Sequence, residues 1–252
     1  MGIVLAILLF GFIVFFHELG HFLLAKKNGI RVDEFSLGLG PTLLGKQIGE
    51  TKFSLKLLPF GGACMMGEDD ADDLSEGSFN SKSVWARMSV VAAGPIFNLI
   101  LACVFCFILI MITGYRSPEI TGVLDGYSAQ EEGLQAGDVI TEINGRNVHI
   151  WDDVSLYTMT HADEAPFKVE YERDGKKYTA KLEPRQLEGD AAPLLGVTSG
   201  DIVKPGIFKS VEYSIYKVKY WMNYTVDSLR MLVTGQAGLK DLSGPVGIVN
   251  AV

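Results

Sequence analysis

Two long runs of hydrophobic residues dominate the first half of the chain, Ile3 to Ala25 and Val90 to Ile112. As an α-helix, each would span roughly 34 Å, which is enough to cross a hydrocarbon core about 30 Å thick. Both runs therefore predict transmembrane helices. A cleaved signal peptide is the alternative for the first run, but no Lys or Arg precedes it and no small-residue cleavage site follows it.

The segment between the two runs, Val32 to Gly62, predicts strands rather than helix. Phe53, Leu55 and Leu57 alternate with polar residues, and glycines punctuate the preceding stretch. A β-hairpin or a small sheet is the simplest account. It can dip into the edge of the bilayer where it packs on protein or lines a cavity, or it can be a small cytoplasmic sheet, and the sequence leaves both open.

The second half of the chain has the composition of a soluble domain followed by an amphipathic segment. Strand-like stretches at residues 119–123, 139–143, 167–173 and 178–182 predict a compact α/β module of about 70 residues. Ile207 to Thr234 mixes aromatic and aliphatic residues with Lys, Asp and Arg, which predicts an amphipathic helix lying on a membrane or on other helices. Its aromatic residues could equally form plain core.

Charge sets the expected orientation in the membrane. Basic residues flank the two runs on the side of the segment between them: Lys26, Lys27, Arg31, Lys82 and Arg87. Because positively charged loops stay in the cytoplasm, that segment is expected to be cytoplasmic, and everything after about Tyr115 extracytoplasmic. The predicted location is the cell membrane, crossed more than once.

Overall charge and cysteine content argue against a nucleic-acid-binding protein and against a disulfide-stabilised domain. The 252 residues carry a net charge of −8, which argues against nucleic acid as a partner because phosphate binding needs a basic surface. Three cysteines, Cys64, Cys103 and Cys106, cannot form a paired disulfide framework. Two of them lie inside the second apolar run, where packing is the ordinary role of a small polarizable side chain.

The chemistry of the chain is concentrated in His17-Glu18-Leu19-Gly20-His21. On a helix, residues four apart share a face, so both imidazoles can reach one tetrahedral Zn²⁺ while Glu18 holds the attacking water. Zinc lowers the pKa of such a water toward about 7, and Glu18 would take its proton and pass it to the leaving amine. Three ionisable groups in an apolar span cost roughly 2.5 to 3.5 kcal/mol per central charge, which favours a functional site over an idle surface cluster.

Several motifs together resemble the site-2 protease family, in its branch of intramembrane zinc metalloproteases that carry out regulated intramembrane proteolysis in bacteria. The stretch Ser128 to Gly145 resembles the core of bacterial PDZ domains, with a short helix, a Gly-Asp turn, a strand and an Asn-Gly turn. The other matching motifs are His17 to His21, Phe35 to Pro41, Leu58 to Gly62, Ala93 to Asn98 and Leu242 to Ile248. Their combined order covers nearly the whole chain.

The resemblance implies a zinc metalloendopeptidase that cleaves transmembrane segments within the bilayer, such as those of an anti-sigma factor or a signal-peptide remnant. It also implies that the hairpin at Gly61 and Gly62 pairs with the substrate as an unwound strand and that Asn98 binds the substrate backbone. A polar residue that only bonds another helix is the alternative for Asn98. In the PDZ domain, Leu195 and Gly196 would belong to the loop that captures a peptide carboxylate, or the domain would screen out substrates with large ectodomains.

One part of the family pattern is missing from this sequence. The family places its third zinc ligand in an Asp-Gly segment of a further transmembrane helix, and the sequence reaches Val252 without one. A catalytic zinc normally has three protein ligands. Asp33, Asp69 and Asp72 lie in the predicted cytoplasmic loop and are poor substitutes, so we expect the chain to be C-terminally truncated.

The expected fold class is a membrane α-helical protein with two transmembrane helices, a membrane-associated β-hairpin or sheet, and an extracytoplasmic α/β PDZ domain. The expected divisions are a first transmembrane helix at 1–25, a cytoplasmic loop with the hairpin at 26–89, a second transmembrane helix at 90–114, the PDZ domain at 115–200 and a membrane-associated segment at 201–252.

Two other functions are compatible with parts of the sequence. The first is a catalytically inactive PDZ adaptor, anchored in the membrane, that holds substrate peptides and keeps the zinc motif as a relic. The second is a transporter or channel that uses the intramembrane carboxylate, which is disfavoured because two spans make no conduction path.

Overall fold

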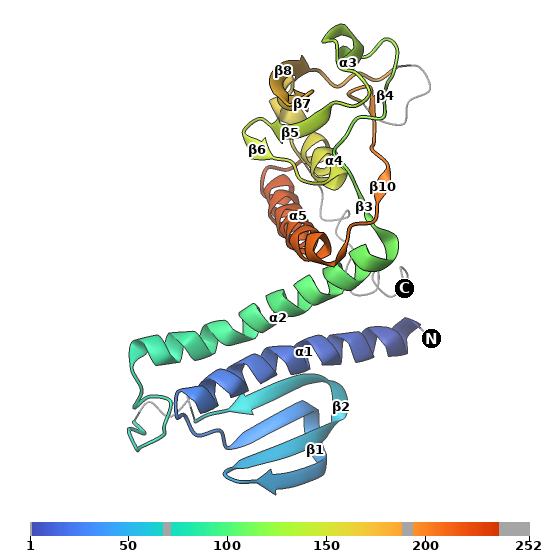
Figure 1. Ribbon diagram of the computed structural model, residues 1–252. Coiled ribbons are helices and arrows are strands. Elements are labelled where there is room, and N and C mark those ends of the chain that lie inside the picture. The colour runs from blue at the N-terminus through green and yellow to red at the C-terminus, as the bar shows by residue number, and fades with distance from the viewer. Residues whose placement is uncertain (1, 68–71, 188–193, 237–252) are drawn as a thin grey trace. The chain divides into compact units, whose positions relative to one another are not determined.

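The computed structural model describes residues 2–67, 72–187 and 194–236, which form two compact units. The first unit contains the chain up to Ala102, and the second begins at Cys103 (Figure 1). The motif Leu242 to Ile248 and the residue Asp69, both considered above, lie outside the described residues.

Two helices are long and apolar enough to cross a membrane, α1 (Gly2–Lys27) and α2 (Val84–Thr113). Only 11% and 17% of the residues in their most apolar stretches are buried, whereas the core helix of a soluble protein is mostly buried. Helix α2 begins before the predicted Val90 because Ser83 caps it, accepting a hydrogen bond from the Ala86 backbone N–H at 3.3 Å.

The predicted hairpin is a curled sheet built from two long strands, β1 (Glu34–Ile48) and β2 (Thr51–Met65). Each strand folds back on itself. Phe35 therefore pairs with Phe53 as well as with Cys64, while Leu44 pairs with Leu55. The first part of β1 thus lies between the two halves of β2, and the last part of β2 forms an edge of this sheet.

An aromatic cluster joins the sheet to α1. The rings of Phe22 and Phe53 each contact Phe35, with centroids 5.2 and 5.8 Å away, and Phe15 contacts Phe35 at 5.9 Å. Buried aliphatic residues, among them Ala25, complete this core. The apolar side of β1 and β2 is therefore fixed against the helix that carries the His-Glu-x-x-His motif.

The second unit is an α/β module with a four-stranded antiparallel sheet in the order β6-β5-β7-β8. Its elements are β3 (Tyr115–Arg116), β4 (Gly122–Val123), α3 (Ser128–Glu131), β5 (Val139–Ile143), β6 (Arg146–Asn147), α4 (Trp151–Thr160), a 3₁₀ turn (Ala162–Glu164), β7 (Phe167–Arg173), β8 (Lys176–Leu182), β9 (Val197–Thr198), β10 (Ile202–Val203) and α5 (Ile207–Val233). The predicted strands at 139–143 and 167–173 coincide with β5 and β7.

The strand predicted at 119–123 is shorter in the structure because this stretch changes partners along its length. Glu119 bridges to Val139 at the start of β5, whereas the Thr121 backbone N–H donates to the carbonyl of Thr198 in β9. Only β4, which pairs with β9, remains as a regular strand. The core of the module is formed by residues from the sheet and from α4, including Ile140, Val154 and Phe167.

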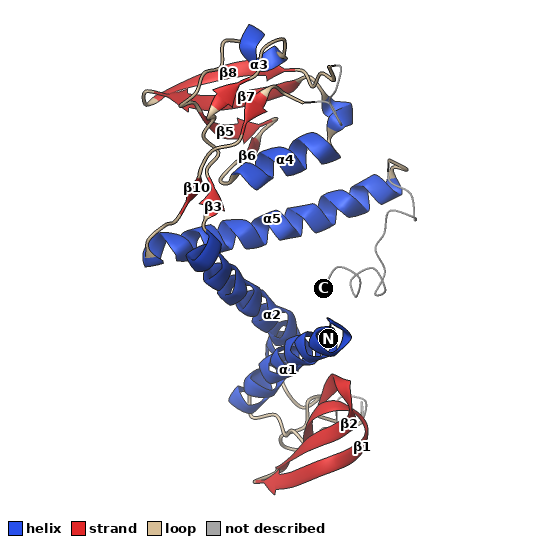
Figure 2. Ribbon diagram, turned by 90° about the vertical axis from the view of Figure 1, so that its right-hand side faces the viewer, coloured by secondary structure: helices blue, strands red, loops and turns tan. Residues whose placement is uncertain are grey.

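Helix α5 packs beside α4 in the second unit, as Figures 1 and 2 both show. Its polar side faces the module: Arg146 donates to the buried Asp227 at 2.8 Å, and Lys217 donates to Asp152 at 3.0 Å. Its exposed side is apolar and includes Phe208, Ile215, Trp221 and Val226. The amphipathic helix predicted from sequence is present, and its apolar residues do not form the core of the module.

Candidate functional site

Helix α1 brings His17 and His21 onto one face, as the spacing of four predicts. Their ring centroids are 4.8 Å apart, with the ring planes at 78° to each other. Both side chains, and that of Glu18 between them, are half-buried. Two imidazoles and a carboxylate are thus gathered within about one turn of one helix.

Two residues of helix α2, Val90 and Asn98, contact the two imidazoles. The carbonyl oxygen of Val90 lies 2.8 Å from His21 Nδ1, and Nδ2 of Asn98 lies 3.2 Å from His17 Nδ1. The Nδ1 atom of each imidazole therefore has a partner on α2. The Nε2 atoms are left as the nitrogens that can bind a metal.

Gly94 lies between Val90 and Asn98 on this face of α2, and both Nε2 atoms lie close to it. A Cβ atom added at Gly94 would lie 2.6 Å from His17 Nε2 and closer still to His21 Nε2. Real Cβ atoms essentially never come so close to another atom. The two Nε2 atoms therefore converge on the position that only glycine leaves open.

The edge segment of β2 runs beside α1 next to Glu18. A Cβ atom at Gly62 would lie 3.1 Å from Glu18 Cγ, and one at Gly11 would lie 2.8 Å from the carbonyl oxygen of Pro59. The strand and the helix can approach this closely because both contribute glycines. Gly61 adopts φ +88°, and a Cβ atom there would collide with Leu39.

The residues of this site fit a zinc ion. Imidazole Nε2 is a common zinc ligand, and a ligating His usually has its second ring nitrogen held by a hydrogen-bond partner, as both are here. Among residues 2–67, 72–187 and 194–236, no group of three His, Cys, Asp or Glu side chains could hold a metal. The two imidazoles are therefore the candidate ligands that this part of the chain offers. Asp33 instead accepts a hydrogen bond from Arg31 at 2.9 Å.

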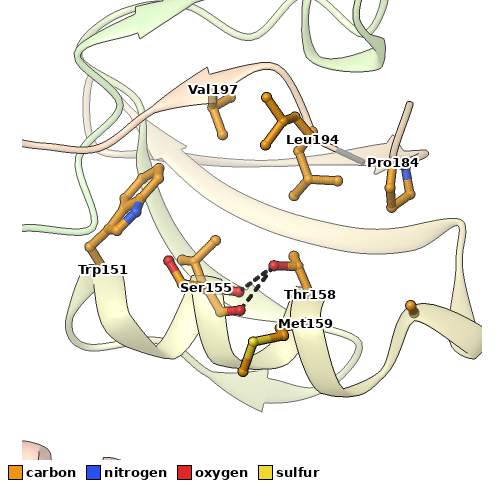
Figure 3. Close-up of a pocket in the computed structure, with 10 residues that line it drawn as sticks. Trp151, Ser155, Thr158, Met159, Pro184, Leu194 and Val197 are labelled. Atoms are coloured by element: carbon orange, nitrogen blue, oxygen red, sulfur yellow. Dashed lines mark hydrogen bonds between the residues drawn. The ribbon is translucent and has the colours of Figure 1, made fainter. Parts of the chain in front are cut away.

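Leu195 and Gly196 belong to the second unit, where they adjoin a separate cavity of about 400 Å³. Figure 3 shows Trp151, Ser155 and Met159 on α4 facing Leu194 and Val197 across it. Further residues that line the cavity are Val154, Thr158, Ala162, Pro184 and Leu195. The lining is mainly apolar and fits an apolar side chain of a bound peptide.

The loop at Gly196 is fixed by the chain before α3. Gly196 has φ +85°, and a Cβ atom there would overlap the side chain of Tyr127. Its carbonyl oxygen accepts a hydrogen bond from the Leu124 N–H at 2.8 Å, and the Leu195 carbonyl accepts one from the Ala129 N–H at 3.2 Å. The conformation therefore needs glycine at position 196.

Comparison with known proteins places these features in a family. The model of peptidase family M50 matches residues 5–251. A protein of Clostridium acetobutylicum that is named as a candidate zinc metalloprotease is 39% identical over 248 residues, covering 98% of this chain and 73% of the relative. The zinc metalloprotease RasP of Bacillus licheniformis is 30% identical over 325 residues, covering 96% of this chain and 77% of that protein.

The chain belongs to peptidase family M50, the site-2 protease family. The predictions of this family and of a protease are confirmed, and the adaptor alternative is not favoured. Among solved structures, part of the chain is similar to the PDZ domain of the SdrC-like protein from Listeria monocytogenes. That likeness has 24% identity and a TM-score of 0.28, and it covers 34% of this chain and 88% of that one.

Sequence reasoning missed two parts of the site. Gly94 was seen only within a family motif, and the Val90 carbonyl gives no side-chain signal at all. The spacing Val90, Gly94, Asn98 is the one feature that could have revealed them, because it places all three on one helix face. Asn98 itself was predicted, and the structure brings it to His17.

Proposed function

We propose that this protein is a zinc metalloendopeptidase that cleaves transmembrane segments of other proteins within the bilayer. The observation that carries the proposal is the convergence of His17 Nε2 and His21 Nε2 over Gly94, beside Glu18, between two helices long enough to span a membrane. A paired imidazole site next to a carboxylate suits hydrolysis of a peptide bond.

Zinc is the cofactor, and His17 and His21 would hold it through their Nε2 atoms. When bound, the metal supplies Lewis acidity, which polarises a carbonyl and makes water acidic enough to lose a proton near neutral pH. Glu18 accepts that proton and later gives it to the nitrogen of the departing amine. The third protein ligand comes from outside the described residues.

The edge of β2 is the proposed binding site for an unwound substrate. A helix must unwind before its backbone carbonyl can reach the site, and its free N–H and C=O groups then need partners in a water-poor environment. The segment at Gly61 and Gly62 offers backbone groups at the edge of a sheet, beside Glu18, where an extended peptide can add as a strand. Asn98 bonds to the substrate backbone from the α2 side.

The second unit serves as a PDZ domain that selects substrates. The cavity beside Leu195 and Gly196 accepts the end of a peptide, or the domain sterically excludes substrates that still carry a large ectodomain. We place this domain outside the cytoplasm and the loop that contains β1 and β2 inside, with a membrane-protein remnant such as an anti-sigma factor or a signal peptide as substrate.

Glu18→Gln tests the catalytic assignment. The variant should retain zinc, because Glu18 is not a ligand, and should lose cleavage of a transmembrane substrate by at least about 100-fold, as expected when a general base is removed. The experiment compares zinc content and cleavage in detergent-purified protein, with Glu76→Gln in the loop as a matched control. Full cleavage by Glu18→Gln would refute the assignment.

A further inference from the structure

Asn98 contacts the zinc site at an atom whose chemistry matters for metal binding. A neutral imidazole has one N–H and one lone pair, so the partner of Nδ1 decides whether Nε2 can bind a metal. His21 illustrates the metal-binding tautomer: the Val90 carbonyl oxygen can only accept, so His21 Nδ1 must donate the hydrogen bond at 2.8 Å. Its Nε2 therefore keeps the lone pair.

The corresponding contact of His17 has the opposite polarity. The atom of Asn98 that lies 3.2 Å from His17 Nδ1 is the amide nitrogen Nδ2, which only donates. With Nδ1 as the acceptor, the proton of a neutral His17 would sit on Nε2, and that atom would have no lone pair for zinc. This arrangement conflicts with the convergence of both Nε2 atoms over Gly94.

The surroundings of Asn98 remove the conflict. Its carbonyl oxygen Oδ1 is buried and has no hydrogen-bond partner among the described residues. Rotation of the amide by 180° exchanges the positions of Oδ1 and Nδ2, so it loses no hydrogen bond at the Oδ1 end. It places an acceptor 3.2 Å from His17 Nδ1 and gives His17 the same tautomer as His21.

We propose that Asn98 is a positioning residue of the zinc site, whose side-chain carbonyl oxygen accepts a hydrogen bond from His17 Nδ1–H and keeps the His17 Nε2 lone pair directed at the metal. The proposal rests on His17 being a zinc ligand, as proposed above. The rotated amide nitrogen takes the buried position that Oδ1 occupies before the rotation.

Metal affinity tests this role separately from activity. Asn98→Leu removes the acceptor at similar size and should weaken zinc binding by about 10- to 100-fold, the usual cost of losing a partner that orients a ligand. Asn98→Asp keeps an acceptor but no donor, so its zinc affinity should stay within about threefold of the original or increase. Zinc affinity is measured on the detergent-purified protein by competition with a chromophoric chelator.

The optical spectrum of the Co²⁺-substituted protein gives a second readout, since it reports the ligand geometry. Asn98→Asp should preserve the spectrum, and Asn98→Leu should change it. The exposed neighbour Leu99 supplies the matched control, and Leu99→Ala should alter neither measurement. The proposal is overturned if Asn98→Leu binds zinc as tightly as the unaltered protein, or if Asn98→Asp loses as much affinity as Asn98→Leu.

A His17→Ala variant separates this inference from the proposed function. If His17→Ala loses zinc while Asn98→Leu keeps it, His17 is a ligand and only the role of Asn98 is wrong. If His17→Ala keeps the full zinc affinity, the assignment of the metal site itself fails, and the positioning role fails with it.

Discussion

At the scale of single residues, the candidate site depends on its glycines as much as on its His and Glu side chains. The Nε2 atoms of both imidazoles occupy space that a side chain at Gly94 would need, and Gly62 leaves space beside Glu18. A methyl group at either position would displace a functional side chain. The chemistry of His17 and His21 thus requires the absence of side chains on the facing elements.

Gly94→Ala should abolish zinc binding while α2 remains intact, because alanine is a better helix former than glycine and its Cβ would collide with both Nε2 atoms. Zinc content after purification and helix content by circular dichroism would check this. Gly206→Ala is the matched control, since a methyl group there meets nothing within 4 Å. Stoichiometric zinc in Gly94→Ala would show that the two Nε2 atoms do not meet at this position.

A second residue-scale prediction concerns Asp138, which is buried in the module. Burial alone would raise the pKa of this carboxyl, but hydrogen bonds from Arg173 and the Gln135 backbone N–H, together with the Arg173 charge, lower it below its ordinary value. The folded state therefore favours the ionised form. This contribution to stability is present above the ordinary Asp pKa of about 3.9 and is lost as the pH falls through the lower pKa of the folded state.

Arg173→Met should destabilise the module by about 3 kcal/mol at neutral pH, because it leaves the Asp138 carboxylate buried without its cation. Hydrogen exchange of the β5 and β7 amides in the whole protein measures the free energy of local opening. The loss should shrink as the pH falls toward the ordinary Asp pKa, because burial without Arg173 favours the protonated form of Asp138 in the variant. An Arg173→Met protein with unchanged exchange at neutral pH would contradict this account.

At the scale of elements, sequence patterns predict what each segment is, but only in part how it pairs. The two apolar runs are α1 and α2, and the alternation at Phe53, Leu55 and Leu57 falls in β2. The folding of β1 between the two halves of β2 could not be predicted. That topology depends on Phe35 reaching both Phe53 and Cys64, and these pairings are set by packing against α1 rather than by local pattern.

The sequence pattern predicts that α5 is amphipathic, and the packing of α5 on the module shows which of its faces is exposed. Its polar residues face the module through the ion pairs of Asp227 and Lys217, which leaves Phe208, Trp221 and Val226 exposed. An apolar helix face of this kind is typical of a segment that lies in a membrane interface. The amphipathic segment therefore stays predicted to be membrane-associated.

Trp221 offers a direct test of that prediction. In a variant where Trp85 and Trp151 are replaced by Phe, fluorescence comes from Trp221 alone, and reconstitution into nanodiscs with brominated lipids should quench it strongly. The same protein with a further Phe208→Asp and Val226→Asp change should show less quenching, because charges oppose insertion of this face. Equal fluorescence with brominated and ordinary lipids would mean that α5 lies away from the bilayer.

At the scale of the whole molecule, the sequence predicts the orientation through its basic residues, which the structure does not test. Single cysteines at Glu76 and Glu183, placed in a chain whose three native cysteines are replaced, should react differently in intact cells. A membrane-impermeant maleimide should label the cysteine at 183 and spare the one at 76. Labelling of position 76 in intact cells would reverse the predicted topology.

The sequence predicts those residues of the candidate site that belong to a recognisable motif. His17, Glu18 and His21 carry a spacing that makes sense on one helix, and Asn98 carries a family motif. Gly94 and the Val90 carbonyl could not be recognised, because their role appears only when two helices distant in the chain are brought together, as in the contact of His21 with Val90, 69 residues away. Backbone groups and empty space leave little trace in a single sequence.

The measurement that tests the account most directly is X-ray absorption at the zinc edge of the purified protein beside its His17→Ala and His21→Ala variants. The account predicts zinc with scattering from two imidazole rings in the unaltered protein, and loss of zinc or of one imidazole in each variant. Zinc with no imidazole scattering, or the same imidazole scattering in all three proteins, would contradict a metal site made by His17 and His21.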